Sequence, residues 1–353
     1  MLHHFHAPRS SRRRLLAAAA AVGMTIRVPL LAAEPFVNYA KRDAVRYWAA
    51  QVSEKRDIPF AWIIQTLSRA RMSDSTIKIM SRPALTASTT PKNWLRHRQR
   101  FITAARVADG CRFLEDHAPA FQACEERFHV PSAVVASVIG IETNYGRLMG
   151  TTKTLDALCT LSFDYTRRAA FFQNELESFL ALFWKAKTDP LTVRGSFAGA
   201  LGICQFMPSS IERLGIDLDE DGVVNLMTSV EDAVASAANY LHSVGWDDAL
   251  PISWACRVPS SAAPFFATGE PVLTTTLQNL LDAGIELKAP LAVPPSLKVL
   301  LADFPLEKQR HYRVGTVNFA ALLDYNRSFF YAQSVADLAA CITARQVLPP
   351  DLP

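Results

Sequence analysis

Several classes of protein are excluded by what this sequence of 353 residues lacks. Its most apolar stretch, Leu15–Ile26, is short of the roughly 20 residues that a membrane-spanning helix needs. The 14 glycines and 21 prolines follow no period, so the chain is neither collagen-like nor of low complexity. Apolar residues make up 50% of the sequence, which is enough to bury a sizeable core and too much for a disordered protein.

Excess charge is also absent once the N-terminus is set aside. The formal charge is +4, but residues 1–33 hold five arginines and no Asp or Glu. Subtracting these five leaves −1 for the remainder of the chain. A chain without a basic surplus lacks the electrostatic footprint of a nucleic-acid-binding protein, so we exclude that class.

Residues 1–33 are typical of an export signal. The arginines at 12–14 precede the apolar stretch, as in a twin-arginine signal, and Ala32 and Ala33 suit a signal peptidase. A buried N-terminal helix is the alternative, but folded helices rarely begin with three arginines and no acidic residue. No cysteine follows the expected cleavage point, so we expect a soluble periplasmic protein without a lipid anchor or a transmembrane segment.

The six cysteines leave disulfide pairing open. They are Cys111, Cys124, Cys159, Cys204, Cys256 and Cys341. An oxidising compartment would permit bridges, but the spacings contain no CxxC pair and no zinc pattern. Cys111 and Cys124 flank a stretch that looks helical, which would hold them too far apart to bond. We expect most of the six to be small buried residues.

Apolar periodicity predicts a mainly α (α+β) protein. The expected helices are Tyr39–Leu67, Val107–Phe128, Ser132–Thr143, Thr166–Lys187, Pro208–Leu214, Val230–Val244, Phe319–Tyr325 and a C-terminal helix to about Ala344, with a connector at Ser81–Pro91. The expected strands are Pro271–Thr276, Leu297–Leu301 and Tyr312–Phe319. We therefore expect a helical domain over 34–246, a small β-rich subdomain over 247–318, and a segment 319–345 that completes the helical domain.

Glu142 is the strongest candidate for a catalytic residue. It ends the stretch Ser132–Thr143, which is apolar nearly all round and should form an interior helix. Burial and the negative end of a helix dipole both raise the pKa of a carboxyl there. A glutamic acid that stays protonated near neutral pH can act as the general acid of glycosidic cleavage. The alternative is a Glu142 that turns outward or pairs with Arg147.

Three other features suit a polar ligand. A loop of small residues, Ser196–Ser210, offers close backbone approach and the amide of Gln205. Arg167 and Arg168 open a helix with two guanidinium groups, and Tyr325-Asn326 pairs an aromatic face with an amide. Each feature also has a plain structural explanation: a packing turn, a solvated helix face and a core tyrosine.

The acidic segment that begins at Asp217 suggests a calcium site. Asp217, Asp219 and Asp221 occupy positions 1, 3 and 5 of an EF-hand loop, and Val223 would offer its carbonyl at position 7. Position 12 is Thr228 rather than the usual Glu, so Glu231 at position 15 would close a lengthened loop. Such a site would be structural, since its ligands come from the protein. An acidic capping loop without metal is the alternative.

These motifs occur together, and in the same order, in one known family. The chain resembles the lytic murein transglycosylases of the B type over roughly residues 35 to 345. The motifs that carry the resemblance are Ile139-Gly-Ile-Glu142-Thr-Asn-Tyr-Gly146, Leu155-Asp-Ala-Leu, Thr160-Leu-Ser-Phe-Asp-Tyr165, Arg167-Arg168, Gly195-Ser-Phe-Ala-Gly-Ala200, Gln205-Phe-Met-Pro-Ser-Ser210, the Asp217 loop and Tyr325-Asn-Arg-Ser328.

The resemblance implies a lysozyme-like helical fold with a small β domain and an EF-hand-like Ca²⁺ site, but no organic cofactor. It implies cleavage of the β-1,4 bond between N-acetylmuramic acid and N-acetylglucosamine in peptidoglycan, with 1,6-anhydromuramoyl ends as product. Glu142 would be the sole acid and base, because the sugar's own 6-hydroxyl replaces water. A lysozyme-type hydrolase and a non-catalytic murein-binding scaffold are the alternatives.

The resemblance also assigns roles to the other candidate residues. Arg167 and Arg168 would hold substrate, while Gln205, Tyr325 and Asn326 would line the glycan-binding site. Ser196 is a weaker candidate for contacting the sugar beside the catalytic glutamate. The family often carries a sugar-stacking tyrosine where this chain has His97. We expect a monomer, while exo or endo cleavage and stem-peptide preference stay open.

Overall fold

The computed structural model describes residues 38–81, 92–267, 269–288 and 293–350. The expected export signal at 1–33 and nearly all of the expected connector at Ser81–Pro91 lie outside these ranges. In chain order, the helices of the first half are η1 (Tyr39–Lys41), α1 (Asp43–Arg56), α2 (Phe60–Leu67), α3 (Asp74–Met80), α4 (Trp94–Phe101), α5 (Ala104–Asp116), α6 (Ala118–Phe128), α7 (Ser132–Thr143), α8 (Thr154–Phe163), η2 (Thr166–Arg168) and α9 (Ala169–Lys185).

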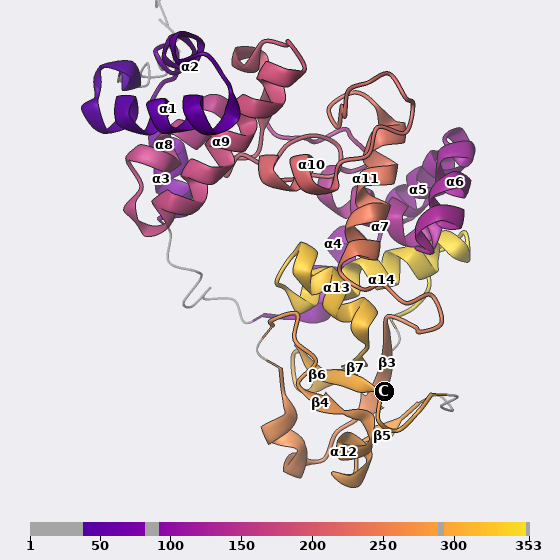
Figure 1. Ribbon diagram of the computed structural model, residues 1–353. Helices are drawn as coiled ribbons and strands as arrows, with labels where there is room; N and C mark the ends of the chain where they lie inside the picture. The colour runs from indigo at the N-terminus through magenta and orange to yellow at the C-terminus, as the bar shows by residue number, and fades with distance from the viewer. Residues whose placement is uncertain (1–37, 82–91, 268, 289–292, 351–353) are drawn as a thin grey trace, which may run out of the picture. The chain divides into compact units, whose positions relative to one another are not determined.

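The second half alternates helices with short strands (Figure 1). Its helices are η3 (Pro190–Thr192), α10 (Pro208–Leu214), α11 (Val230–Ser243), η4 (Ser260–Phe265), α12 (Leu277–Asp282), α13 (Val317–Tyr325) and α14 (Phe329–Thr343). The strands are β1 (Thr152–Lys153), β2 (Arg194–Gly195), β3 (Ser253–Arg257), β4 (Thr275–Thr276), β5 (Glu286–Leu287), β6 (Lys298–Pro305) and β7 (Arg310–Gly315). The mainly α, α+β prediction is confirmed.

Two of the longer predicted helices are broken by local backbone geometry. The stretch 39–67 divides at Asp57, which has a left-handed φ of 53° and is followed by Ile58 and Pro59. The stretch 107–128 divides at His117, whose φ and ψ leave the helical region before α6 begins. Apolar periodicity runs through both breaks because the helices on either side bury the same face against one core.

The helix that contains Glu142 and the helix that follows the Gln205 loop have the bounds that the sequence predicts. Helix α7 spans Ser132–Thr143 and α10 spans Pro208–Leu214, as expected. Helix α7 is buried almost throughout, and the Glu125 carboxylate accepts a hydrogen bond from the Ser132 amide at 2.9 Å. A carboxylate at this position also offsets the positive end of the helix dipole. Helices α3, α4 and α8 were not expected.

Five of the strands form one antiparallel sheet in the order β4-β6-β7-β3-β5. The expected strands Leu297–Leu301 and Tyr312–Phe319 correspond to β6 and β7, with shifted ends, and only Thr275–Thr276 of Pro271–Thr276 is a strand. Strand β3 was missed, although it pairs with both β7 and β5.

Strand β6 joins the two main hydrophobic clusters of the fold. Leu300, Ala302 and Phe304 belong to the large core of the helices, whereas Val299 and Leu301 belong to a smaller cluster that contains residues of α12. Alternate residues of a strand point to opposite faces, so both faces of β6 are covered. The Phe304 ring also lies 5.3 Å from that of Trp94 and 6.0 Å from that of Phe330, which ties the sheet to α4 and α14.

The described residues belong to one compact unit, so the division at 246 and 318 stays a prediction. All six cysteines are free thiols; five are buried, and Cys111 is half-buried. This agrees with the expectation of small core residues. Within the described part of the chain, no helix is both long and apolar enough to cross a membrane.

Candidate active site

The carboxyl of Glu142 lies at the C-terminal end of the buried helix α7. Burial raises the pKa of Glu142 to about 7, and the hydroxyl of Tyr331 on α14 opposes part of this rise. That hydroxyl is itself buried and forms no well-shaped hydrogen bond with a described residue. A carboxyl with a pKa near neutrality can both donate and accept a proton at physiological pH.

The alternative in which Glu142 pairs with Arg147 is wrong. The Arg147 guanidinium instead pairs with the carboxylate of Asp109 on α5. Hydrogen bonds from Arg147 and Arg112 hold the pKa of Asp109 below its usual range. Among the residues that the structure describes, no cation favours the charged form of Glu142, in agreement with its raised pKa.

A left-handed turn ends α7 directly after the glutamate. Asn144, Tyr145 and Gly146 all have positive φ, at 51°, 61° and 81°. This conformation is costly for tyrosine, by roughly 1–2 kcal/mol, and is held by tertiary contacts. The Tyr145 hydroxyl donates to the carbonyl of Arg106 at 2.9 Å, and its ring packs against Phe113.

The loop that carries Gln205 is fastened to the end of α7. The hydroxyl of Thr143, next to Glu142, donates to the carbonyl of Ile203 at 2.6 Å. Gln205 has a left-handed φ of 53°, and its side-chain nitrogen donates to the carbonyls of Met149 and Gly202. The amide nitrogen of Gln205 thus holds the loop together and leaves its oxygen as the group that can accept a hydrogen bond.

Ser196 opens this loop and shapes it. Its hydroxyl oxygen accepts hydrogen bonds from the backbone amides of Ala198 and Ala200, and its own amide donates to the carbonyl of Ala200. These bonds form a tight turn of the kind that serine commonly stabilises. Ser196 is half-buried, so its hydroxyl proton remains free to point toward a ligand.

Three tyrosines form a cluster on one side of Glu142. The Tyr325 ring lies 4.7 Å from that of Tyr240 on α11 and 6.2 Å from that of Tyr331, with which it is nearly parallel. The Tyr325 hydroxyl donates to the carbonyl of Cys204, which connects α13 to the Gln205 loop. Burial, followed by the nearby charge of Glu142, raises the pKa of Tyr331 well above its usual value.

Two members of this cluster were missed in the sequence. Tyr331 lies six positions after Tyr325, and Tyr240 lies in a helix whose apolar face gave no reason to single it out. Aromatic residues on two separate predicted helices were the only available signal. Asn326, which was expected beside the aromatic face, is exposed and ends α13.

His97, which the sequence resemblance singled out, packs inside an aromatic group. Its ring lies 4.9 Å from that of Phe101 and 5.0 Å from that of Phe330, and it stacks on Trp94. Burial, and then the charge of Arg100, lower the pKa of His97. These contacts favour a neutral, structural histidine.

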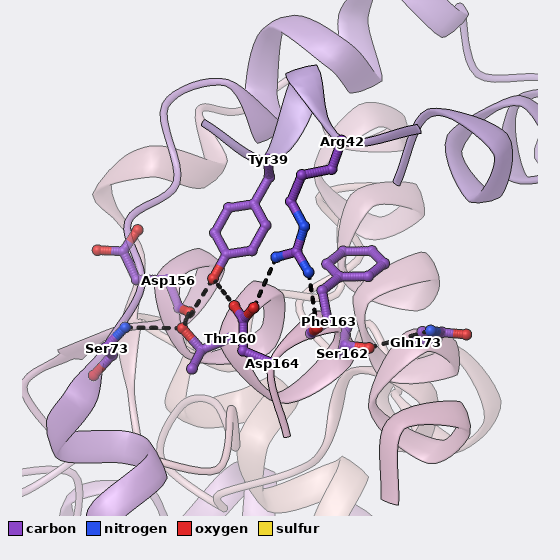
Figure 2. A network of polar contacts seen from close by, with 9 residues as sticks. All are labelled: Tyr39, Arg42, Ser73, Asp156, Thr160, Ser162, Phe163, Asp164 and Gln173. Carbon is purple, nitrogen blue, oxygen red and sulfur yellow. Dashed lines mark hydrogen bonds and ion pairs between the residues drawn. The ribbon is translucent and has the colours of Figure 1, made fainter. Parts of the chain in front are cut away.

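Arg167 and Arg168 are exposed on η2, one turn after a network that fixes the end of α8 (Figure 2). The carboxylate of Asp164 accepts a hydrogen bond from the Tyr39 hydroxyl at 2.6 Å and one from Arg42 at 2.7 Å. Arg42 also donates to the carbonyl of Phe163. This network holds the segment before the two arginines against η1, far away in the sequence.

The structure does not join the arginines to Glu142 directly. In the described ranges, neither forms a hydrogen bond or ion pair with the glutamate. The Arg168 guanidinium instead lies 4.1 Å from the centre of the Phe171 ring, which fixes its direction by a cation–π contact.

The three aspartates of the acidic loop converge. Carboxylate oxygens of Asp217, Asp219 and Asp221 lie within 4.8 Å of one another. Backbone amides of Asp221 and Gly222 donate to the carboxylate of Asp217, which folds the loop around it. Gly222 has a φ of 92°, the conformation for which this position of an EF-hand loop requires glycine.

Glu231 does not join this group. Its carboxylate lies 3.6 Å from the imidazole of His117, the residue between α5 and α6. The neighbouring Asp232 is buried and accepts hydrogen bonds from the amides of Leu218 and Asn225, both at 2.8 Å, so it closes the loop against α11. The sequence pattern did not distinguish the two acids, because which one faces the loop depends on how α11 packs.

A helical α+β fold with one protonatable glutamate at the end of a buried helix is typical of lysozyme-like, glycan-cleaving enzymes. Comparison with known proteins defines the family. The model of the "Transglycosylase SLT domain" family matches residues 40–340. The membrane-bound lytic murein transglycosylase B of Escherichia coli (strain K12) is 36% identical over 288 residues, which cover 80% of this chain and 78% of the relative.

Solved structures agree. The catenated lytic transglycosylase SltB1 of Pseudomonas aeruginosa superposes with a TM-score of 0.81 at 32% identity, over 87% of this chain and 99% of that one. The Escherichia coli lytic transglycosylase Slt35 in complex with calcium gives a TM-score of 0.78 at 31% identity, over 89% and 97%. The chain therefore belongs to the SLT transglycosylase family, and it is a lytic transglycosylase of peptidoglycan.

Proposed function

We propose that the enzyme cleaves the β-1,4 bond between N-acetylmuramic acid and N-acetylglucosamine and leaves 1,6-anhydromuramoyl ends, with Glu142 as its only acid and base. The observation that carries the proposal is the raised pKa of Glu142, about 7, at the end of a buried helix. Glycosidases that hydrolyse the bond with water usually have a pair of catalytic carboxylates. A single carboxyl suits a reaction in which the nucleophile belongs to the substrate.

The two halves of the reaction use the same proton site. In the first half, the Glu142 carboxyl gives its proton to the 4-oxygen of the leaving N-acetylglucosamine as the bond from C1 to that oxygen breaks. The substrate's N-acetyl group stabilises C1. In the second half, the Glu142 carboxylate takes the proton of the sugar's 6-hydroxyl. The oxygen of that hydroxyl bonds to C1 at the same time. The carboxyl is thereby restored and no water is consumed.

The surrounding residues would hold the glycan. The free side-chain oxygen of Gln205, the hydroxyl of Ser196 and the exposed amide of Asn326 offer hydrogen bonds to sugar hydroxyls or acetamido groups. The partly exposed face of Tyr325 would stack on a sugar ring. The buried hydroxyl of Tyr331 interacts with Glu142 and would lie beside the reacting bond.

Arg167 and Arg168 would bind the carboxylates of the stem peptide. Both are exposed, and guanidinium groups match carboxylates in geometry. The network around Asp164 supports this role because it fixes the backbone from which the two side chains extend.

Digestion of purified peptidoglycan tests the reaction type. We expect mass spectrometry to find muropeptides that are lighter than reducing-end products by one water. Reducing ends alone would show a lysozyme-type hydrolase instead. Substitution of Glu142→Gln should lower the cleavage rate by about 10²–10⁴. Undiminished cleavage by this variant would remove the assignment of Glu142, and no cleavage by the natural chain would favour a murein-binding scaffold.

We also propose a structural Ca²⁺ site in the acidic loop. Asp217, Asp219 and Asp221 supply the hard oxygen ligands that Ca²⁺ prefers, and the carbonyl of Val223 would add another. With Glu231 turned to His117, no bidentate carboxylate closes the site, which favours modest affinity. Added Ca²⁺ should raise the melting temperature by mass action, and chelation should reverse this. Asp219→Asn should abolish the response; an equal response in this variant would contradict the site.

The location of the mature protein stays a prediction. The paired arginines favour export to the periplasm with cleavage near residue 33. The relative from Escherichia coli is named as membrane-bound, whereas we expect a form without a lipid anchor. Mass spectrometry of the protein isolated from the periplasmic fraction would test both the cleavage point and the absence of lipid.

A further inference from the structure

A cavity whose lining does not include Glu142 lies between α2 and the end of α9. We call it the tryptophan pocket; it has a volume of about 710 Å³, and the residues that characterise it are Trp62, Gln65, Arg69, Trp184, Lys185 and Asp189. None of these residues belongs to the site around Glu142.

The end of α9 creates this pocket. The helix ends at Lys185, and Lys187 takes a left-handed φ of 53° while its amide donates to the carbonyl of Trp184. The amide of Thr188 donates to the carbonyl of Phe183 one turn earlier. This C-terminal turn sends the chain back so that Thr188 and the residues after it line the same cavity as α2.

An open aromatic face forms one wall of the pocket. Trp184 is 38% exposed, and its ring lies 5.2 Å from that of Trp62 at an angle of 57°. The two rings support each other, but one side of Trp184 stays in contact with water. A large apolar ring held rigid at the mouth of a cavity is typical of a binding site. The C–H groups on the face of a sugar ring can pack on such a surface.

The other wall is polar and mainly positive. Arg69, Lys185 and Lys187 face the cavity with a single carboxylate, that of Asp189. Asp189 accepts a hydrogen bond from the amide of Leu191, so it is partly occupied in capping η3. In the described ranges none of the three cations forms an ion pair. The pocket therefore suits a ligand that combines sugar rings with carboxylates.

A neighbouring cavity of about 840 Å³ is lined in part by the same residues, Phe183, Lys185, Thr188 and Asp189. Its lining also includes Arg194, which precedes Ser196 by two positions, and residues 217 and 222–228 of the acidic loop. The surface beside the tryptophan pocket is therefore hollowed as well, which suits an extended chain better than one small molecule.

We infer that the tryptophan pocket is an accessory binding site for peptidoglycan, at which sugar rings pack on Trp184 and stem-peptide carboxylates pair with Lys185 and Lys187. The proposed ligand is peptidoglycan, the substrate of the family. The inference rests on the proposed function for the exact structure of that substrate. Such a site would keep the enzyme on insoluble peptidoglycan between cleavage events, without a role for its residues in the reaction itself.

Sedimentation with purified, insoluble peptidoglycan sacculi tests this site separately from catalysis. All variants carry Glu142→Gln so that the sacculi stay intact. Trp184→Ala should weaken binding about three- to tenfold, as expected for the loss of one aromatic face. Trp184→Phe should restore most of it. Tyr47→Ala is the matched control, since Tyr47 is 70% exposed on α1 and lies outside the pocket.

Equal binding by the Trp184→Ala variant and its parent would overturn the inference, and so would an equal loss with Tyr47→Ala. If Trp184→Ala does not fold, the double variant Lys185→Gln, Lys187→Gln tests the same pocket at two exposed positions. Its binding to sacculi should depend less on salt concentration than that of the parent. Product analysis with the active enzyme decides the proposed function independently.

Discussion

Replacement of Glu142 by glutamine should change stability as a function of pH, in addition to removing activity. The amide of glutamine has nearly the shape of a protonated carboxyl but cannot ionise. In the natural protein, burial raises the pKa of Glu142 from 4.5 to about 7, so the folded state holds its proton over a pH range in which the unfolded chain has lost it. The stabilisation that comes from this raised pKa is fully present below about pH 4.5 and is lost as the pH rises through about 7.

The magnitude follows from the two pKa values. A shift of one unit is equivalent to about 1.4 kcal/mol, so the whole effect is on the order of 3 kcal/mol. Between pH 5 and pH 8, the free energy of unfolding of the natural protein should fall relative to that of the variant by about 2.5 kcal/mol. All other groups titrate alike in the two proteins, so they cancel in the difference.

Urea unfolding of both proteins at pH 5 and pH 8 measures this difference. As the pH rises, the free energy of unfolding of the variant should increase relative to that of the natural protein, even though the variant has lost cleavage activity. Glu54→Gln is the matched control, because it makes the same substitution at an exposed position of α1 outside the site. A stability gap between Glu142→Gln and the natural protein that is equal at both pH values would refute a Glu142 that keeps its proton in the folded state.

Two further perturbations test the framework around the site. Gly202→Ala should lower the free energy of unfolding in urea by more than about 3 kcal/mol, because its φ is +72° and the new Cβ would meet the Leu226 carbonyl oxygen at 2.3 Å. Gly222→Ala should lower it by only about 1 kcal/mol, because its φ is +92° but no atom lies within 4 Å of the new Cβ. Equal costs would mean that packing around Gly202 is loose. Asp164→Asn should lose about 1–3 kcal/mol because Tyr39 donates to this carboxylate; no loss would make the network of Figure 2 unimportant for stability.

Much of the candidate site could be predicted because its key helix is defined locally. Pro131 and an apolar run fix α7 without reference to the rest of the chain, and the position of Glu142 at its end already gives the direction of its pKa shift. The acidic loop is similar, since the spacing of its aspartates and Gly222 is a property of one short segment. The family motifs are likewise short segments of consecutive residues.

The rest depends on residues that are far apart in the sequence. Tyr331 reaches Glu142 only because α14 packs against α7, and Arg147 is diverted from the glutamate only because α5 presents Asp109. Whether Glu231 or Asp232 faces the acidic loop is decided by the rotation of α11 in the core. The sequence thus determined the helix, the acid and the loop through short-range spacing. Tertiary packing alone decided their neighbours, because contacts between distant segments leave no periodic signal in the chain.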